Sequence, residues 1–160
     1  MVAMEELKKR RREDYGFHLE YRTRWYDSIV NSYLLQHCGL QPATSAQIGL
    51  VVHSSSTYFA PVGFPAVLEL GLRVRKLGTS SVMYEIGVFE KHPSSVGVME
   101  KNEVESGNGV SEQAVQPVKA VGEFVHVFVN RNSNRPAAQG MEVDLRVGLA
   151  KLLAKPSLSL

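Results

Sequence analysis

The feature that most constrains the fold is an almost uncharged stretch with helical spacing in the N-terminal part of the chain. Residues 29 to 38, IVNSYLLQHC, place Ile29 and Tyr33 on one helical face, with Val30 and Leu34 beside them. A helix that is apolar over most of its surface needs cover from other elements. The rest of the chain must therefore supply a layer that wraps around this helix.

The other segments alternate in the manner of strands. Apolar and polar residues follow a period of two along residues 17 to 26, 49 to 61, 66 to 78, 80 to 91 and 118 to 130. The third and fourth of these segments meet at a tight turn, KLGTS, and are predicted to form a hairpin. Residues 142 to 155 have the spacing of a last amphipathic helix. The predicted fold is α+β, with a curved antiparallel sheet wrapped around one central helix and a C-terminal helix.

The length of 160 residues fits a single domain. We expect residues 1–16 to be a charged tail or short helix, residues 17–153 to form the domain, and residues 154–160 to be a second tail. Residues 92–117 are rich in Gly, Ser and Glu and have little periodicity. They are long for a connection in a compact domain, so we predict a mobile insertion there.

Charge and cysteine content argue against several classes of protein. The net charge is only +2, and much of the basic excess lies in the run Lys8–Arg12, so no extended nucleic-acid-binding face is indicated. The single cysteine, Cys38, rules out an intramolecular disulfide and suits a reducing compartment, which makes the cytoplasm the expected location. No apolar run approaches the roughly 18 residues of a membrane-spanning helix. The scattered histidines have no metal-ligand spacing, and no cofactor is expected.

Five stretches follow one another in an informative order. They are RTRWYD, SIVNSYLLQHCGL, VHSSSTYFAPVGF, ELGLRVRKLGTSSVMYEIGVFE and AVGEFVHVFV. In their order and spacing, over residues 17–91 and 118–153, the chain resembles the hotdog-fold acyl-CoA thioesterases, in particular the 4-hydroxybenzoyl-CoA thioesterase-like group. The resemblance implies hydrolysis of an acyl-CoA to free acid and coenzyme A without a metal or redox cofactor. It also implies a homodimer whose sheets join edge to edge, or a tetramer of such dimers.

The chain departs from this family at the catalytic loop. In the family the first strand leads into a loop of the form DxDxxGHVNN, and the second Asp provides the chemistry. Asp27 matches the first Asp and Ser28 matches the first residue after the Asn pair, but the residues between them have no counterpart. Asp27 is then a carboxylate that flanks the catalytic position, and Ser28 could cap the helix.

Two explanations of this departure are open. The favoured one is that the sequence omits a loop, because strand-to-helix connections usually take about 2 to 6 residues and here the two patterns touch. The intact mass of the purified protein would then exceed 17.7 kDa by several residues. Alternatively, the polypeptide truly lacks the loop and is an altered enzyme or a non-catalytic acyl-CoA-binding protein.

Candidate residues for the acyl group lie on both sides of the join. Trp25 and Tyr26 could line an acyl pocket or simply pack in the core. On the strand HSSSTY, Ser55 or Ser56 could orient the thioester or a water, with Tyr58 nearby, or these hydroxyls could bond locally. His126, between two phenylalanines, is interpreted as a satisfied strand histidine.

Candidate residues for coenzyme A lie in the predicted hairpin. Its cations are Arg73, Arg75 and Lys76, and the turn adds backbone amides around Gly78 and three hydroxyls, those of Thr79, Ser80 and Ser81. In the context of the family resemblance, these groups could hold the phosphates. The alternative is a solvated hairpin rim.

Overall fold

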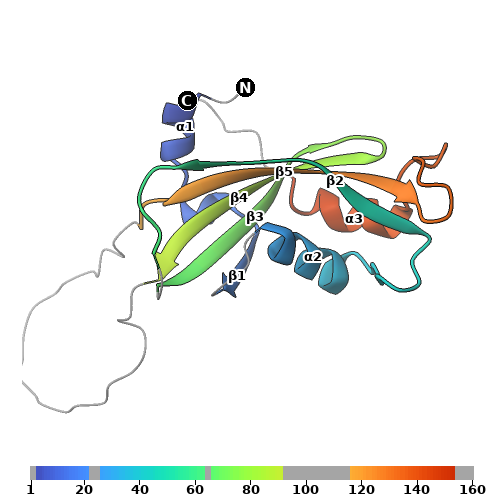
Figure 1. The fold of residues 1–160 in the computed structure, drawn as a ribbon, viewed down its shortest axis with the longest axis horizontal. Coiled ribbons are helices and arrows are strands. Elements are labelled where there is room, and N and C mark those ends of the chain that lie inside the picture. The colour runs from blue at the N-terminus through green and yellow to red at the C-terminus, as the bar shows by residue number, and fades with distance from the viewer. Residues whose placement is uncertain (1–2, 22–25, 64–65, 92–115, 154–160) are drawn as a thin grey trace, which may run out of the picture.

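The computed structural model describes residues 3–21, 26–63, 66–91 and 116–153 (Figure 1). These residues form one antiparallel sheet of five strands in the order β1-β3-β4-β5-β2. The strands are β1 (Phe17–Tyr21), β2 (Gln47–Tyr58), β3 (Val67–Leu77), β4 (Ser81–Lys91) and β5 (Ala120–Asn130). The helices are α1 (Met4–Lys8), the short 3₁₀ helix η1 (Arg12–Asp14), α2 (Tyr26–His37) and α3 (Val143–Ala150). No helix among these residues is long and apolar enough to cross a membrane.

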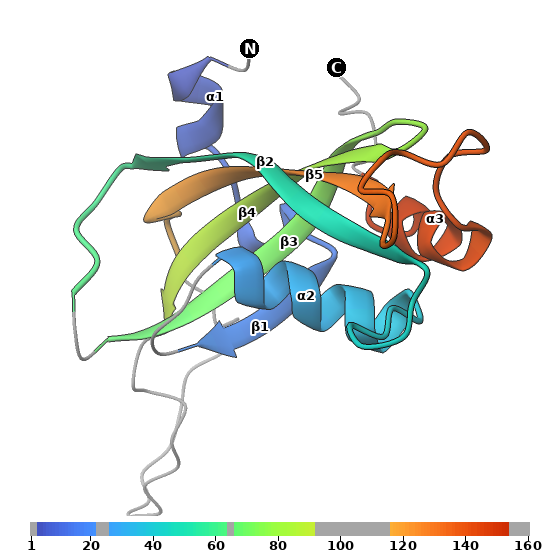
Figure 2. The same cartoon turned by 45° about the vertical axis from the view of Figure 1, so that its right-hand side comes forward.

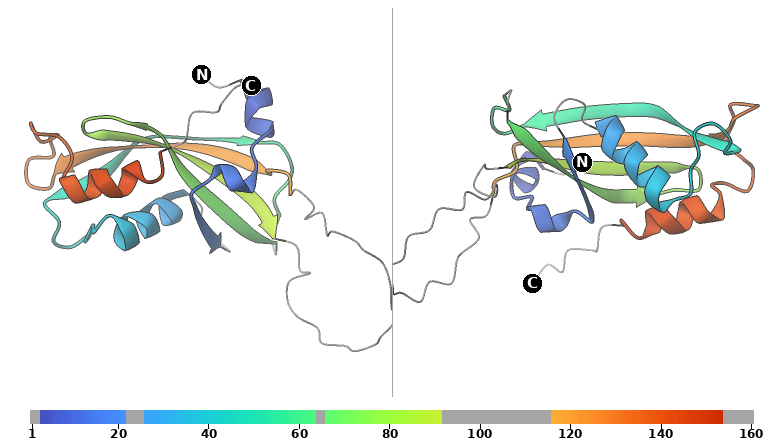
Figure 3. Two further views of the ribbon diagram at one scale, coloured as in Figure 1. Left: turned by 180° about the vertical axis from the view of Figure 1, so that it is seen from behind. Right: turned by 90° about the horizontal axis from the view of Figure 1, so that it is seen from below.

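The sheet separates two layers of unequal thickness. Helices α2 and α3 lie on one face, which we call the concave face, and α1 lies on the other, the convex face (Figure 1). Figure 2 shows the long twisted strands passing over α2, and Figure 3 shows α2 and α3 side by side beneath the sheet. The predicted α+β architecture, a curved sheet around one central helix, is confirmed.

The core forms where α2 meets the concave face. Helix α2 buries four residues, Ile29, Val30, Tyr33 and Leu34, as its spacing predicts. Strand β4 opposes them with alternate side chains that are fully buried, namely Val82, Tyr84, Ile86 and Val88. Burial of each large aliphatic side chain stabilises the fold by roughly 1.5–3 kcal/mol. The predicted hairpin is also confirmed, with β3 and β4 paired from Val67↔Lys91 to Leu77↔Val82.

The start of α2 corrects the expected join between strand and helix. Strand β1 ends at Tyr21, and Tyr26, Asp27 and Ser28 all lie in the first turn of α2. The prediction of a strand through Tyr26 is therefore wrong, and Ser28 is inside the helix rather than its cap. Residues 22–25 lie outside the described residues, so the omitted loop stays a prediction. Trp25 and most of the predicted insertion, residues 92–115, lie outside the described residues.

The convex face is closed by the segment that follows α1. Tyr15 is buried there, and its ring lies over Gly71 of β3 and Gly87 of β4. A Cβ added at Gly87 would come 2.5 Å from two ring carbons of Tyr15. Glycine is therefore needed at this position so that the tyrosine can reach the sheet.

We expect Gly87→Ala to lower the free energy of unfolding by about 1–3 kcal/mol, because Tyr15 must shift off the sheet. Urea denaturation measures this loss. Gly63→Ala is the matched control, since a Cβ there would meet nothing within 4 Å. Equal stability of the two variants would contradict the close packing of Tyr15.

Candidate functional site

The N-terminal turn of α2 brings two predicted site residues together on the concave face. The Ser56 hydroxyl donates a hydrogen bond of 2.8 Å to the Tyr26 hydroxyl. The Tyr26 ring lies directly over Gly122 of β5, where any Cβ would clash with it. Burial raises the pKa of Tyr26, so its phenol stays protonated at neutral pH.

Asp27 is the carboxylate of this turn. Its Oδ1 accepts a hydrogen bond of 2.9 Å from Asn31 Nδ2, one helical turn further on. The side chain is otherwise exposed, and it lies at the end of α2 where the helix dipole favours negative charge. Asp27 is also the only carboxylate between Arg22 and His37 in the sequence. It is therefore an oriented, solvent-accessible carboxylate in the same helical turn as Tyr26.

Below this turn, His126 of β5 is a buried polar group. Its ring makes edge contacts with Tyr84 and Phe128, and its Nδ1 has no hydrogen-bond partner among the described residues. The expectation of a satisfied histidine is wrong on this point. Burial lowers the pKa of His126 to about 4, although Asp27 opposes the shift. The imidazole is thus neutral at pH 7.

The register of β2 distinguishes between the two predicted serines. Ser56 pairs with Gly122 and faces Tyr26, whereas Ser55 pairs with Glu123 and faces the opposite side. Ser55 lines a cavity on the convex face. Tyr58 lies two residues beyond Ser56, is exposed, and adds to the raised pKa of Tyr26. Ser56 is therefore the serine that belongs to the concave site.

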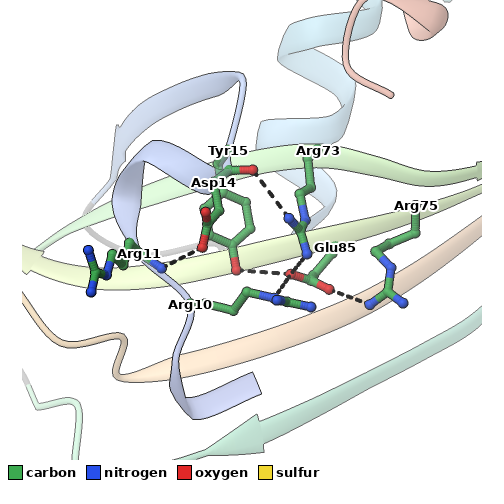
Figure 4. Close-up of polar contacts among 7 residues, drawn as sticks. All are labelled: Arg10, Arg11, Asp14, Tyr15, Arg73, Arg75 and Glu85. Atoms are coloured by element: carbon green, nitrogen blue, oxygen red, sulfur yellow. Dashed lines mark hydrogen bonds and ion pairs between the residues drawn. The ribbon is translucent and has the colours of Figure 1, made fainter. Parts of the chain in front are cut away.

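The convex face holds a cluster of charges around Glu85 (Figure 4). Three arginines contact this carboxylate: Arg10 Nε at 2.9 Å, Arg73 Nη2 at 2.8 Å and Arg75 Nη1 at 2.7 Å. The Tyr15 hydroxyl donates to the same carboxylate at 3.2 Å. Burial alone would raise the pKa of Glu85, but the arginines more than offset it, so this pKa is lowered. We call these five residues the Glu85 cluster.

Glu85 was missed in the sequence, where it interrupts the apolar run VMYEIGVF. A lone acidic residue in a strand that is otherwise buried was the available signal, since such a charge requires partners. Arg73 and Arg75, two residues apart on β3, were visible in the sequence as possible partners for that charge. Arg10 could not be paired with them from the sequence.

The predicted coenzyme A residues fall into two separate places. Arg73 and Arg75 belong to the Glu85 cluster, while Lys76 is exposed. The turn from Gly78 to Ser81 packs elsewhere, because the Thr79 carbonyl accepts from the Met141 amide and the Ser80 carbonyl accepts from the Phe128 amide. The Gly78 amide already donates to the Ser81 carbonyl at 2.8 Å. The hydroxyls of the turn remain candidates for a ligand, but its backbone is largely engaged.

Comparison with known proteins assigns the family. The thioesterase superfamily matches this chain over residues 23–96. The crystal structure of the PA5185 protein from Pseudomonas aeruginosa strain PAO1 is 35% identical in sequence, with 90% of this chain and 96% of that chain covered and a TM-score of 0.70. This chain belongs to the thioesterase superfamily. A search of curated protein sequences found no match.

More distant structures show that this thioesterase-superfamily chain has the hotdog fold. A 4-hydroxybenzoyl-CoA thioesterase mutant complexed with 4-hydroxybenzoyl-CoA is 13% identical, with 85% of this chain and 97% of that chain covered and a TM-score of 0.57. A 1,4-dihydroxy-2-naphthoyl-CoA thioesterase from Synechocystis is 12% identical, with 85% of this chain and 98% of that chain covered and a TM-score of 0.56. In this superfamily member, the described residues contain no group of three or more His, Cys, Asp or Glu arranged to hold a metal ion.

We expect Glu85→Gln to destabilise this thioesterase-superfamily protein by about 3–5 kcal/mol at pH 7, because three arginines lose their buried counter-charge. Since the pKa of Glu85 is lowered in the fold, its stabilisation is present above the unfolded pKa and is lost as the pH falls through the folded value. Denaturation at several pH values measures both effects.

The control is Glu90→Gln, whose partner Lys119 lies at 3.4 Å in a more exposed pair. We expect a loss below about 1 kcal/mol for that variant. An equal loss for the two glutamates would contradict the central role of Glu85.

Proposed function

We propose that this protein hydrolyses an acyl-CoA thioester to the free acid and coenzyme A at the N-terminal turn of α2. Membership of the thioesterase superfamily supports thioester hydrolysis in general. One observation supports placing the reaction at this turn. Asn31 orients Asp27, which follows Tyr26 of the Tyr26–Ser56 pair in the sequence. Solved relatives that act on 4-hydroxybenzoyl-CoA or 1,4-dihydroxy-2-naphthoyl-CoA support the choice of coenzyme A as leaving group.

The proposed reaction uses one water and no covalent intermediate. Asp27 accepts a proton from the water, whose oxygen then bonds to the thioester carbonyl carbon. The carbonyl oxygen gains negative charge, which unpaired amides in the first turn of α2 are suited to stabilise. Ser56 and Tyr26 orient the carbonyl. The carbon–sulfur bond then breaks, the thiolate of coenzyme A takes up the proton, and the acid is released.

The coenzyme A phosphates are proposed to bind at Lys76 and the hydroxyls of Thr79, Ser80 and Ser81. Lys76, Thr79 and Ser81 are exposed, and Ser80 is half-buried. Arg73 is the weaker candidate because its side chain is buried against Glu85. A flexible lysine acting as a point charge is adequate for a phosphate at the surface.

The alternative function is binding of an acyl-CoA without turnover. It is favoured by the sequence itself, which lacks the second Asp, the Gly-His and the Asn pair of the loop that this family resemblance implies. Asp27 would then lie at the edge of a pocket that has lost its catalytic carboxylate.

Asp27→Asn tests the choice between the two functions. We expect the variant to lose about 10²- to 10⁴-fold in kcat with little change in KM, because the amide cannot accept the proton. Thiol release from a panel of acyl-CoAs measures the rate. Asp144→Asn is the matched control, since Asp144 is an exposed acid in the first turn of α3. If the natural protein releases no thiol but coenzyme A raises its Tm, the protein is a binding module.

We also propose that the protein is a homodimer joined through β2. This strand is one edge of the sheet, and it exposes Leu50, Val51 and Val52 in succession. A long edge strand with unpaired backbone groups and apolar side chains is suited to pairing with a second copy.

We expect Val52→Lys to convert the dimer to a monomer, because lysine on an edge strand opposes pairing. Light scattering coupled to size exclusion measures the mass. Val143→Lys changes an even more exposed valine, on α3, and should leave the mass unchanged. Dissociation by both variants, or by neither, would contradict an interface at β2.

A further inference from the structure

A cavity of about 670 Å³ lies between α1 and the convex face of the sheet. Its apolar wall is formed by Met4 and Leu7 of α1 and by Met83 and Val121 of the sheet. Its polar wall is formed by Ser55, Thr57, Arg75, Glu85 and Glu123. The sheet separates this cavity from Asp27 and Tyr26, because Ser55 and Ser56 point to opposite faces of β2. The cavity is thus distinct from the proposed hydrolytic site.

The cation in the polar wall is part of a surplus of positive charge. Three arginines surround one carboxylate in the Glu85 cluster, so the cluster carries a net charge of 3 − 1 = +2. Arg75 contacts Glu85 through Nη1 only, and its other nitrogens have no hydrogen-bond partner in the described part of the chain. The Arg75 side chain remains 29% exposed, whereas that of Glu85 is 4% exposed. Arg75 can therefore accept an anion without releasing Glu85.

A second carboxylate in the lining does not cancel this charge. Glu123 is 44% exposed on its side chain and lies 3.5 Å from the His53 imidazole. Water therefore screens Glu123 strongly, in contrast to the buried cluster. The hydroxyls of Ser55 and Thr57 line the same cavity and can act as donors. The polar wall is suited to a single negative charge.

We propose that this cavity binds a small amphipathic carboxylate. The carboxylate lies on Arg75, with Ser55 and Thr57 as further donors, and the hydrocarbon tail lies between α1 and Met83. An apolar lining with a few convergent polar groups and a volume of several hundred Å³ is typical of small-molecule sites. The two methionines of the apolar wall, Met4 and Met83, adapt to chains of different shape. An acid released at the concave face would belong to this chemical class, but the site does not depend on that reaction.

Isothermal titration of the full chain with octanoate and with 1-octanol tests the proposal. We expect octanoate to bind one equivalent with a Kd between about 10 µM and 1 mM, and 1-octanol to bind about tenfold more weakly because it lacks the charge. Arg75→Gln should bring the octanoate Kd close to that of the alcohol. Inorganic phosphate should bind more weakly than octanoate, since it cannot use the apolar wall.

A second variant keeps the test independent of the Glu85 cluster. Met83→Trp fills the cavity from β4 without replacing an arginine, and we expect it to abolish octanoate binding. Arg135→Gln is the control, because Arg135 is an exposed arginine in the loop after β5 that does not line the cavity. Absence of octanoate binding, equal binding of the alcohol, or unchanged binding in Met83→Trp would each overturn the proposal.

Discussion

The fold depends on the burial of α2. Its apolar side chains cannot face water, and the concave face of the sheet covers them with residues such as Leu70, Tyr84 and Ile86 that have no exposed surface. The helix can approach the sheet closely where a strand residue has no side chain, as at Gly122 beneath Tyr26. The position of α2 then fixes its first turn, and with it the carboxylate of Asp27. Stability and chemistry thus share one helix–sheet contact.

The period-two alternation of the strands divides the molecule into two chemical environments. On β2 it sends Ser56 toward Tyr26 and Ser55 toward the cavity under α1. On β4 it sends Tyr84 into the core and Glu85 to the convex face. The sheet therefore separates the mostly apolar concave face from the convex face, which is rich in arginine. Ligands on the two sides can differ in charge and shape without competing for the same groups.

Much of the architecture could be predicted, because apolar spacing directly reflects burial. The hairpin of β3 and β4 and the buried face of α2 followed from spacing alone, and Ser56 was already a candidate. The start of α2 was missed because the contact of Tyr26 with Gly122 overrode the strand-like pattern before it. The Glu85 cluster was missed for a different reason: it joins Arg10 to a residue 75 positions away, and no local pattern reports such a pair.

The contact between Arg10 and Glu85 also bears on how the chain folds. Arg10 is made early in synthesis, but its partner Glu85 on β4 of the β3–β4 hairpin follows 75 residues later. The N-terminal segment cannot gain its buried charges or seat Tyr15 until that hairpin has formed, and closing so long a loop has an entropic cost. Docking of residues 10–15 therefore cannot precede formation of this hairpin. Until these residues dock, Phe89 and the arginines of β3 remain uncovered on the convex face of the sheet.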